Sequence, residues 1–154
     1  RPGSPEDVRR VVGLTLEHGL SIVARGGGAS YTDGYAPAER DAVLIDTQRL
    51  DRIVEINERD MYVVVESGVT WARLHEALAP KGLRTPFFGP FSGLAATVGG
   101  SVSQNSISWG SGQHGVSAES VLGIEVVTGT GEVVRTGTWA SPASAPFFRF
   151  YGPD

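Results

Sequence analysis

Three consecutive glycines, Gly26, Gly27 and Gly28, constrain the fold of this chain more than any other feature of its sequence. They follow the short apolar run 22–24, which predicts a strand that ends in a glycine loop. Glycine lets the backbone adopt positive φ and lets another group approach without a Cβ in the way. Such a loop, with successive N–H groups pointing one way, is typical of a phosphate site. A flexible turn is the alternative, and three glycines alone do not decide between the two.

The composition excludes several classes of protein. With 154 residues, 40% of them apolar and 19% charged, the chain fits one globular domain. Its net charge of −4 opposes a nucleic-acid-binding role, and the absence of cysteine excludes disulfides and thiolate chemistry. No apolar run is long enough to span a bilayer, and no signal-peptide pattern is present, so we expect a cytoplasmic protein.

The hydrophobic periodicity predicts an α+β fold with two sub-lobes, at about 1–57 and 58–154. The first sub-lobe is expected to be a small βαβ unit, and the second a mixed sheet with flanking helices. We predict one helix that begins at an N-cap Ser4 and ends at Gly19, with His18 capping its last turn. A second helix is predicted after an N-cap Thr70, and its buried face is expected to consist of Trp71, Leu74 and Leu78. The acidic residues between 55 and 60 have the composition of a solvated turn, so we expect no metal site. Strands are predicted over 22–24, 42–46, 53–56, 61–65, 121–127 and 133–134.

Two familiar phosphate-binding motifs do not match the first glycine loop. A P-loop requires a lysine after its glycines, and this loop has none. A Rossmann fingerprint requires a helix that opens at the glycines, but the residues after Gly28 have no apolar helical stripe.

A second segment rich in glycine and small residues runs from Gly89 to Ser106. No charged residue lies between Gly89 and Ser108. Such a segment offers backbone donors and little bulk, which suits a flat uncharged ring with a polyol tail. A buried glycine-rich turn is the structural alternative for this segment taken alone.

Together these motifs resemble a known family. The residues Ala-Arg-Gly-Gly-Gly-Ala-Ser-Tyr (24–31), Thr-Val-Gly-Gly-Ser-Val-Ser-Gln-Asn (97–105) and Val-Leu-Gly-Ile-Glu-Val-Val-Thr (121–128) occur in the order and spacing of that family. The chain resembles the FAD-binding (PCMH-type) domain of the vanillyl-alcohol oxidase / p-cresol methylhydroxylase flavoproteins. The similarity is strongest to the branch of FAD-linked 2-hydroxy-acid (glycolate or D-lactate) dehydrogenases.

The resemblance implies a set of FAD-binding residues. Residues 26–30 would surround the pyrophosphate through backbone N–H groups, while 91–97 and 104–107 would hold the pyrophosphate, the ribityl chain and the isoalloxazine edge. The strand near Ile124 would meet the adenine through its main chain. Arg25 either steers the anion or pairs with a local carboxylate, and both readings stay open. No catalytic or metal-binding residue is implied, and the full cofactor-binding set is Ala24, Arg25, Gly26, Gly27, Gly28, Ala29, Ser30, Phe91, Ser92, Gly93, Leu94, Ala95, Ala96, Thr97, Gly99, Gly100, Gln104, Asn105, Ser106, Ile107, Ile124 and Val126.

The same resemblance implies non-covalent FAD. Members that attach the flavin from the first loop carry histidine at the position of Ala29, and others use a cysteine in the second segment, which this chain lacks. Some relatives attach FAD from their other domain, so that route stays open.

The implied activity is hydride transfer from a small substrate, such as a 2-hydroxy acid, to the N5 atom of the flavin. We expect the chain to be incomplete at both ends, with the substrate pocket and catalytic base on a C-terminal domain that it lacks. Alone, it is expected to be inactive and to bind FAD poorly. The alternatives are a non-catalytic nucleotide- or phosphate-binding module, or a same-fold enzyme acting on alkylphenols or ether-lipid precursors.

Overall fold

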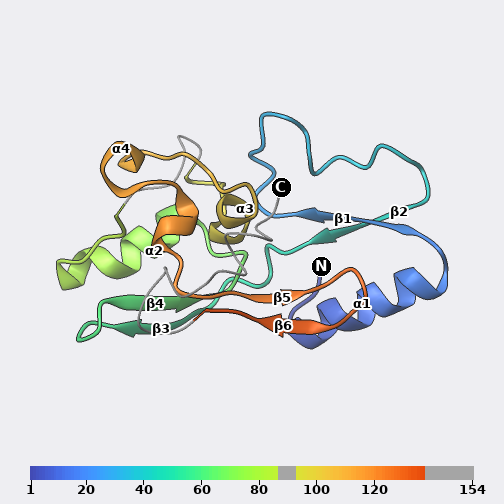
Figure 1. Ribbon diagram of the computed structural model, residues 1–154, viewed down its shortest axis with the longest axis horizontal. Helices are drawn as coiled ribbons and strands as arrows, with labels where there is room; N and C mark the ends of the chain where they lie inside the picture. The colour runs from blue at the N-terminus through green and yellow to red at the C-terminus, as the bar shows by residue number, and fades with distance from the viewer. Residues whose placement is uncertain (87–92, 138–154) are drawn as a thin grey trace.

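The computed structural model describes residues 1–86 and 93–137 (Figure 1). Helices and short strands alternate along this part of the chain, and they confirm the mixed α and β fold predicted from the sequence. In chain order the elements are α1 (Pro5–Glu17), β1 (Ser21–Arg25), β2 (Ala42–Asp46), β3 (Ile53–Asn57), β4 (Tyr62–Val65), α2 (Trp71–Leu78), the 3-10 helix η1 (Ala79–Lys81), α3 (Val98–Ser103), α4 (Ser111–His114), the 3-10 helix η2 (Ser117–Ser120), β5 (Glu125–Val127) and β6 (Val133–Arg135).

Helix α1 begins and ends with the capping groups predicted for it. The Ser4 hydroxyl accepts a hydrogen bond from the Asp7 N–H at 3.1 Å, and Pro5 opens the helix. At the other end, Nδ1 of His18 lies 2.8 Å from the Leu14 carbonyl oxygen. The predicted capping role of His18 is therefore confirmed.

Strands β1 and β2 are parallel, and they lie beside α1 (Figure 1). Parallel strands are usually joined through a helix. Here the connection, residues 26–41, contains no helix, and α1 precedes both strands instead of lying between them. The first glycine loop is the beginning of this connection.

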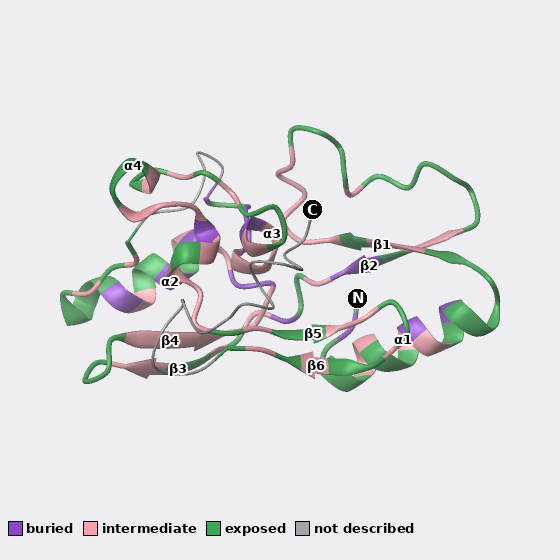
Figure 2. Cartoon of the chain, viewed as in Figure 1, coloured by how far each residue is buried: buried purple, intermediate pink, exposed green. Residues whose placement is uncertain are grey.

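Strands β3 and β4 form an antiparallel hairpin around the turn predicted at residues 57–60. This pairing spans the predicted boundary between the sub-lobes, which itself stays a prediction. Helix α2 follows, with the Thr70 hydroxyl accepting from the Arg73 N–H at 3.2 Å. The face of α2 predicted to be buried packs into the apolar cluster of Val69, Trp71, Leu74, Leu78 and Ala96 (Figure 2).

Two segments differ from the sequence-based assignment. Only residues 125–127 of the predicted strand 121–127 form a strand. The backbone of Gly137 lies so close to the Leu122 carbonyl that a Cβ would not fit, and this close crossing takes the place of a regular strand ladder. Helix α3 was not predicted, because two of its six residues are Gly99 and Gly100, which favour helix weakly.

Candidate functional site

The first glycine loop begins at the edge of the parallel sheet. Arg25 ends β1, and its register partner Asp46 ends β2. The carbonyl oxygen of Arg25 accepts hydrogen bonds from the backbone N–H of Thr47 at 2.9 Å and from its hydroxyl at 3.2 Å. These bonds fix the point at which Gly26 leaves the sheet. Ala24, which was expected to contact the cofactor, lies within β1 opposite Ile45.

The structure brings the first glycine loop against the second glycine-rich segment. A Cβ placed on Gly26 would collide with the Thr97 hydroxyl, and one on Gly27 would collide with the backbone carbonyl of Ala95. In addition, Nε2 of Gln104 donates to the Ser30 hydroxyl at 3.1 Å. The glycines therefore permit two segments about seventy residues apart to touch, a role that the sequence interpretation had assigned to the approach of a ligand.

The second segment is anchored on helix α2. The N–H groups of the first two residues of α2 donate to the carbonyl oxygens of Ala96 and Gly93, at 3.2 and 3.1 Å respectively. Thr97 is 2% exposed, and its hydroxyl accepts from the Gly100 N–H at 3.2 Å, which caps α3. Hydrogen bonds therefore fix the backbone around residues 93–97, next to the buried face of α2.

Backbone N–H groups of both segments have no hydrogen-bond partner among the described residues. Within the described residues, the N–H groups of 26–30 and of 94–97 donate no hydrogen bond to the chain. Residues 26–30 are all partly buried, and an N–H group shielded from water is normally paired with another polar group or an ordered water. A row of unpaired donors on each of two touching segments fits an extended ligand with several acceptor oxygens, such as the FAD pyrophosphate. The residues present therefore fit the cofactor that the resemblance implies.

Arg25 pairs with a local carboxylate, which is one of the two interpretations that the sequence leaves open. Its Nη1 lies 3.4 Å from Oδ2 of Asp46, whose side chain is 8% exposed. The guanidinium also lies 5.6 Å from the ring centroid of Tyr35. Sequence reasoning missed Asp46, although its place at the end of an apolar strand was a usable signal, since the carboxyl ends of parallel strands commonly border ligand sites.

The turn after α3 is held by η2. Oδ1 of Asn105 accepts from the Ala118 N–H at 3.0 Å, and the Ser106 carbonyl accepts from the N–H and the hydroxyl of Ser117 at 3.2 and 3.0 Å. Two apolar side chains of the predicted site, Leu94 and Ile107, are 84% and 78% exposed. They belong to the segments that the resemblance assigns to the ribityl chain and the isoalloxazine edge.

The predicted adenine contacts lie on a different element. Ile124 and Val126 belong to the segment of β5, which lies near α1 (Figure 1). The carbonyl oxygen of Ile124 already accepts from the Thr136 N–H at 3.0 Å, and its N–H donates to the Thr136 hydroxyl at 3.4 Å. Among the described residues, neither is hydrogen-bonded to a glycine-rich segment. Phe91 and Ser92 of the predicted site, and the aromatic segment 142–154, lie outside the described residues.

Acidic side chains of the turn predicted at residues 55–60 pair with neighbouring side chains. Glu55 accepts from the Tyr62 hydroxyl at 2.9 Å, and Glu58 pairs with Lys81 at 2.5 Å. Across residues 1–86 and 93–137, no group of three or more histidine or acidic side chains is arranged to hold a metal ion. In the same ranges, no helix is both long and apolar enough to cross a membrane.

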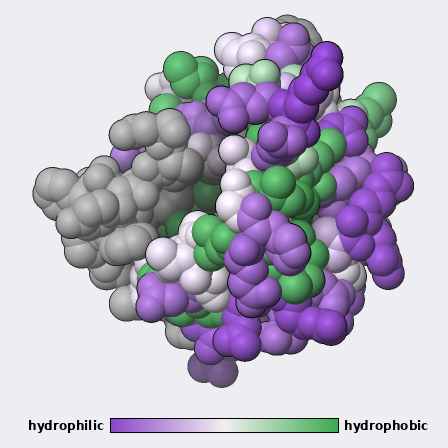
Figure 3. Space-filling model, turned by 90° about the vertical axis from the view of Figure 1, so that its right-hand side faces the viewer, coloured by the Kyte–Doolittle hydropathy of each residue, from purple (hydrophilic) through white to green (hydrophobic). Residues whose placement is uncertain are grey.

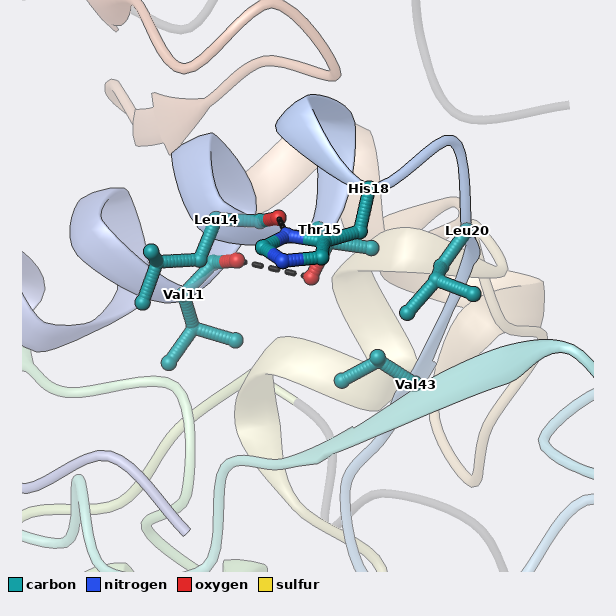
Figure 4. Close-up of a pocket in the computed structure, with 6 residues that line it drawn as sticks. All are labelled: Val11, Leu14, Thr15, His18, Leu20 and Val43. Atoms are coloured by element: carbon teal, nitrogen blue, oxygen red, sulfur yellow. Dashed lines mark hydrogen bonds between the residues drawn. The ribbon is translucent and has the colours of Figure 1, made fainter.

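A shallow pocket of about 250 Å³ lies between α1 and β2 (Figure 4). None of its lining residues belongs to the predicted cofactor site. The Thr15 hydroxyl donates to the Val11 carbonyl at 2.7 Å, and Nδ1 of His18 lies 2.8 Å from the Leu14 carbonyl oxygen. The other four lining residues are apolar.

Comparison with known proteins gives one consistent result. A family model described as "FAD binding domain" matches residues 1–137. Glycolate oxidase subunit GlcD of Bacillus subtilis is 32% identical over 88% of this chain and 28% of its own length. The mitochondrial D-lactate dehydrogenase [cytochrome] of Arabidopsis thaliana is 30% identical over 95% of this chain and 25% of its own length.

Among solved structures, an alkyldihydroxyacetonephosphate synthase superposes with a TM-score of 0.78 and 26% identity, over 89% of this chain and 25% of that one. The chain thus spans less than a third of the length of the curated relatives that it matches. The match nevertheless covers nearly all of the chain, including both glycine-rich segments. The chain therefore belongs to the FAD-binding domain family of the PCMH type, shared by the vanillyl-alcohol oxidase and p-cresol methylhydroxylase flavoproteins.

Proposed function

We propose that this chain is the FAD-binding part of a flavin-dependent oxidoreductase, and that the two glycine-rich segments together bind the FAD pyrophosphate. The supporting observation is the pair of touching segments whose backbone N–H groups, at 26–30 and 94–97, have no partner among the described residues. Hydrogen bonds from such donors to a charged oxygen are stronger than bonds between neutral groups. The chain binds and orients the cofactor through its backbone.

When bound, FAD supplies the redox chemistry of the reaction, by accepting a hydride at N5 of its isoalloxazine ring. The chain's own residues determine where the cofactor lies. Gly26 and Gly27 hold the two donor rows together, and the base of the second segment is buried against α2. We propose that the catalytic base and the substrate pocket lie outside this FAD-binding domain.

We further propose that the substrate is a small 2-hydroxy acid. Support comes from the names of two relatives, a glycolate oxidase subunit and a D-lactate dehydrogenase, whose substrates both belong to this class. Enzymes of the same fold that act on alkylphenols or ether-lipid precursors are the alternative. Anaerobic mixing of the full-length protein with glycolate, D-lactate or 4-methylphenol distinguishes these classes, because only the true substrate class bleaches the flavin absorbance.

We propose that FAD is held without a covalent bond to this chain. The first loop presents the methyl group of Ala29, which is partly buried against the apolar cluster and carries no nucleophile. Acid denaturation followed by filtration tests this point. Free flavin in the filtrate is the expected result, and flavin that stays with the precipitated protein would mean covalent attachment from elsewhere in the protein.

The central experiment is native purification of the full-length protein. We expect a yellow protein with a flavin absorption spectrum. A colourless protein that takes up no added FAD would contradict the proposal and would favour a non-catalytic phosphate-binding module. The isolated chain is expected to bind FAD poorly, and tight binding by it would contradict that expectation. The cytoplasmic location stays a prediction, which cell fractionation tests.

A further inference from the structure

One buried carboxylate joins three segments beneath the first glycine loop. Oδ2 of Asp46 accepts from Nε of Arg1 at 3.0 Å and lies 3.4 Å from Nη1 of Arg25. Its other oxygen, Oδ1, accepts from the N–H of Gln48 at 3.0 Å. The Asp46 side chain is 8% exposed. A single group therefore ties the start of the chain, the end of β1 and the residues after β2 to one point.

Arg25 connects this carboxylate to the glycine loop. A Cβ built on Gly28 would lie 3.0 Å from both Nε and Cζ of Arg25, so the guanidinium packs directly against that glycine. Gly28 has a φ of +68°, which an L side chain rarely adopts. The guanidinium also lies over the ring of Tyr35, with Cζ 5.6 Å from the ring centroid. Arg25 thus fills the space between Asp46, the loop and Tyr35.

We propose that Asp46 is a positioning residue for the anion-binding loop. Acting through Arg25, it holds residues 26–28 in the conformation that leaves their N–H groups available to the pyrophosphate. In this inference Arg25 acts by packing against Gly28 and by pairing with Asp46. This inference rests on the proposed FAD site and adds the residues that hold it in shape.

The direction in which FAD affinity changes when Asp46 is neutralised distinguishes a positioning role from a purely electrostatic one. Removing a negative charge near an anion site strengthens anion binding if only Coulomb forces act. If Asp46 positions the loop, its neutralisation releases Arg25, and FAD binding weakens instead. The planar guanidinium also matters, because lysine carries the same charge but has neither the rigid fork nor the flat face.

The test uses the full-length protein, freed of flavin and titrated with FAD while flavin fluorescence is followed. We expect Asp46→Asn to raise the Kd for FAD about tenfold, by analogy with the loss of metal affinity when a group that orients a metal ligand is removed. Arg25→Met is expected to do the same, and the double variant to add little, because both changes break one connection. The matched control is Asp51→Asn, whose carboxylate pairs with Arg73 on the exposed surface and whose Kd should match that of the wild type.

Two further readouts separate positioning from a direct charge effect. Arg25→Lys is expected to bind FAD as weakly as Arg25→Met, since the charge alone does not restore the packing against Gly28. In Arg25→Met the salt dependence of Kd should stay at the wild-type slope, whereas loss of a direct phosphate ligand would flatten it.

Wild-type protein that binds FAD, together with an Asp46→Asn variant that binds equally well or more tightly, would overturn the inference and leave the proposed function intact. Wild-type protein that binds no FAD would remove the proposed function itself. If Asp46→Asn does not fold, as judged by circular dichroism, Arg25→Lys decides the matter. Wild-type affinity in that variant would contradict positioning, and weakened affinity with a normal spectrum would support it.

Discussion

The two segments that meet at the candidate site are supported in different ways. The second segment rests on a buried apolar cluster around Trp71 and Leu74, which are 5% and 3% exposed (Figure 2). The first loop extends from a two-stranded sheet beside α1, where Leu14 and Leu16 are 56% and 48% exposed. On the end of the molecule shown in Figure 3, apolar surface lies exposed among hydrophilic residues.

This difference indicates what fixes each half of the site. Two strands alone are marginally stable in water. The first loop therefore depends on specific contacts, namely the ion pairs of Asp46 and the close approach of Gly27 to Ala95. The second segment depends on apolar burial, which is less sensitive to any one polar group. The predictions below test this division, beginning with the contact between the halves.

The largest effect is expected for Gly27→Val in the full-length protein. Any side chain at Gly27 would occupy the position of the Ala95 carbonyl, so the two donor rows must separate. We expect loss of bound FAD, measured as the ratio of flavin to protein absorbance, with little change in the far-ultraviolet circular dichroism spectrum.

Gly13→Ala is the matched control for this substitution. Gly13 lies in α1, and no atom stands within 4 Å of the position that its Cβ would take. We expect normal FAD content and a gain in stability of about 0.5–1 kcal/mol, since alanine favours helix. A Gly27→Val variant that retains FAD would contradict the assignment of the pyrophosphate to this loop.

The next prediction compares the apolar cluster that supports the second segment with helix α1, which lies beside the two-stranded sheet from which the first loop extends. Leu74→Ala removes a side chain from the buried cluster and is expected to lower the free energy of unfolding by about 2–5 kcal/mol. Leu14→Ala, on the exposed face of α1, is expected to change it by about 0.5 kcal/mol or less. Urea denaturation of the full-length variants measures both. Equal losses would show that the face of α1 is buried in the whole protein.

Much of this fold was predictable because it depends on helix caps and hydrophobic periodicity, which can be recognised in short stretches of sequence. Ser4 and Thr70 were recognisable helix caps, and the stripe that includes Trp71 and Leu74 indicated the buried face of α2. These features depend on residues close together in the sequence, where capping and periodicity act. The hairpin at residues 53–65 was predictable for the same reason.

The features that were missed depend on residues far apart in the sequence. Helix α3 contains two glycines, and Gly99 is required there because its Cβ would collide with Ser67. The pairing of Arg25 with Asp46 follows from the register of two parallel strands, which no local pattern reveals. The two glycine-rich segments stand out in the sequence, but their mutual contact becomes evident only in three dimensions.

A smaller effect is expected for Thr97→Val, which tests the contact between the second segment and the first loop. The Thr97 hydroxyl caps α3, and it also lies where a Cβ on Gly26 would be. Loss of the cap should cost about 1 kcal/mol of stability, and the bulkier methyl group that replaces the hydroxyl should push the first loop away and weaken FAD binding.

Thr70→Val is the matched control for that change, because Thr70 caps α2 in the same way. It should cost a similar amount of stability while the FAD affinity stays normal. If both variants bind FAD equally well, the hydroxyl of Thr97 has no part in placing the first loop.

The smallest effect concerns an ion pair on the well-packed side. Arg52 donates to Glu66 through its backbone N–H at 2.8 Å and its side chain at 2.7 and 3.0 Å, and the side-chain hydrogen bond from Arg52 is the main reason that the pKa of Glu66 is lowered. A lowered pKa in the folded state means that the unfolded state takes up a proton first as the pH falls. The resulting stabilisation is therefore complete above the ordinary carboxyl pKa of 4.5 and is lost as the pH falls through the folded value.

Glu66→Gln should accordingly cost roughly 0.5–1 kcal/mol of unfolding free energy at neutral pH, and its difference from the wild type should shrink below about pH 4.5. FAD affinity should stay normal, in contrast to Asp46→Asn. Denaturation at a series of pH values, with FAD titration at neutral pH, measures both quantities. If Glu66→Gln weakened FAD binding as much as Asp46→Asn does, ion pairs would support both halves of the site alike, and the division between a packed half and an ion-paired half would not hold.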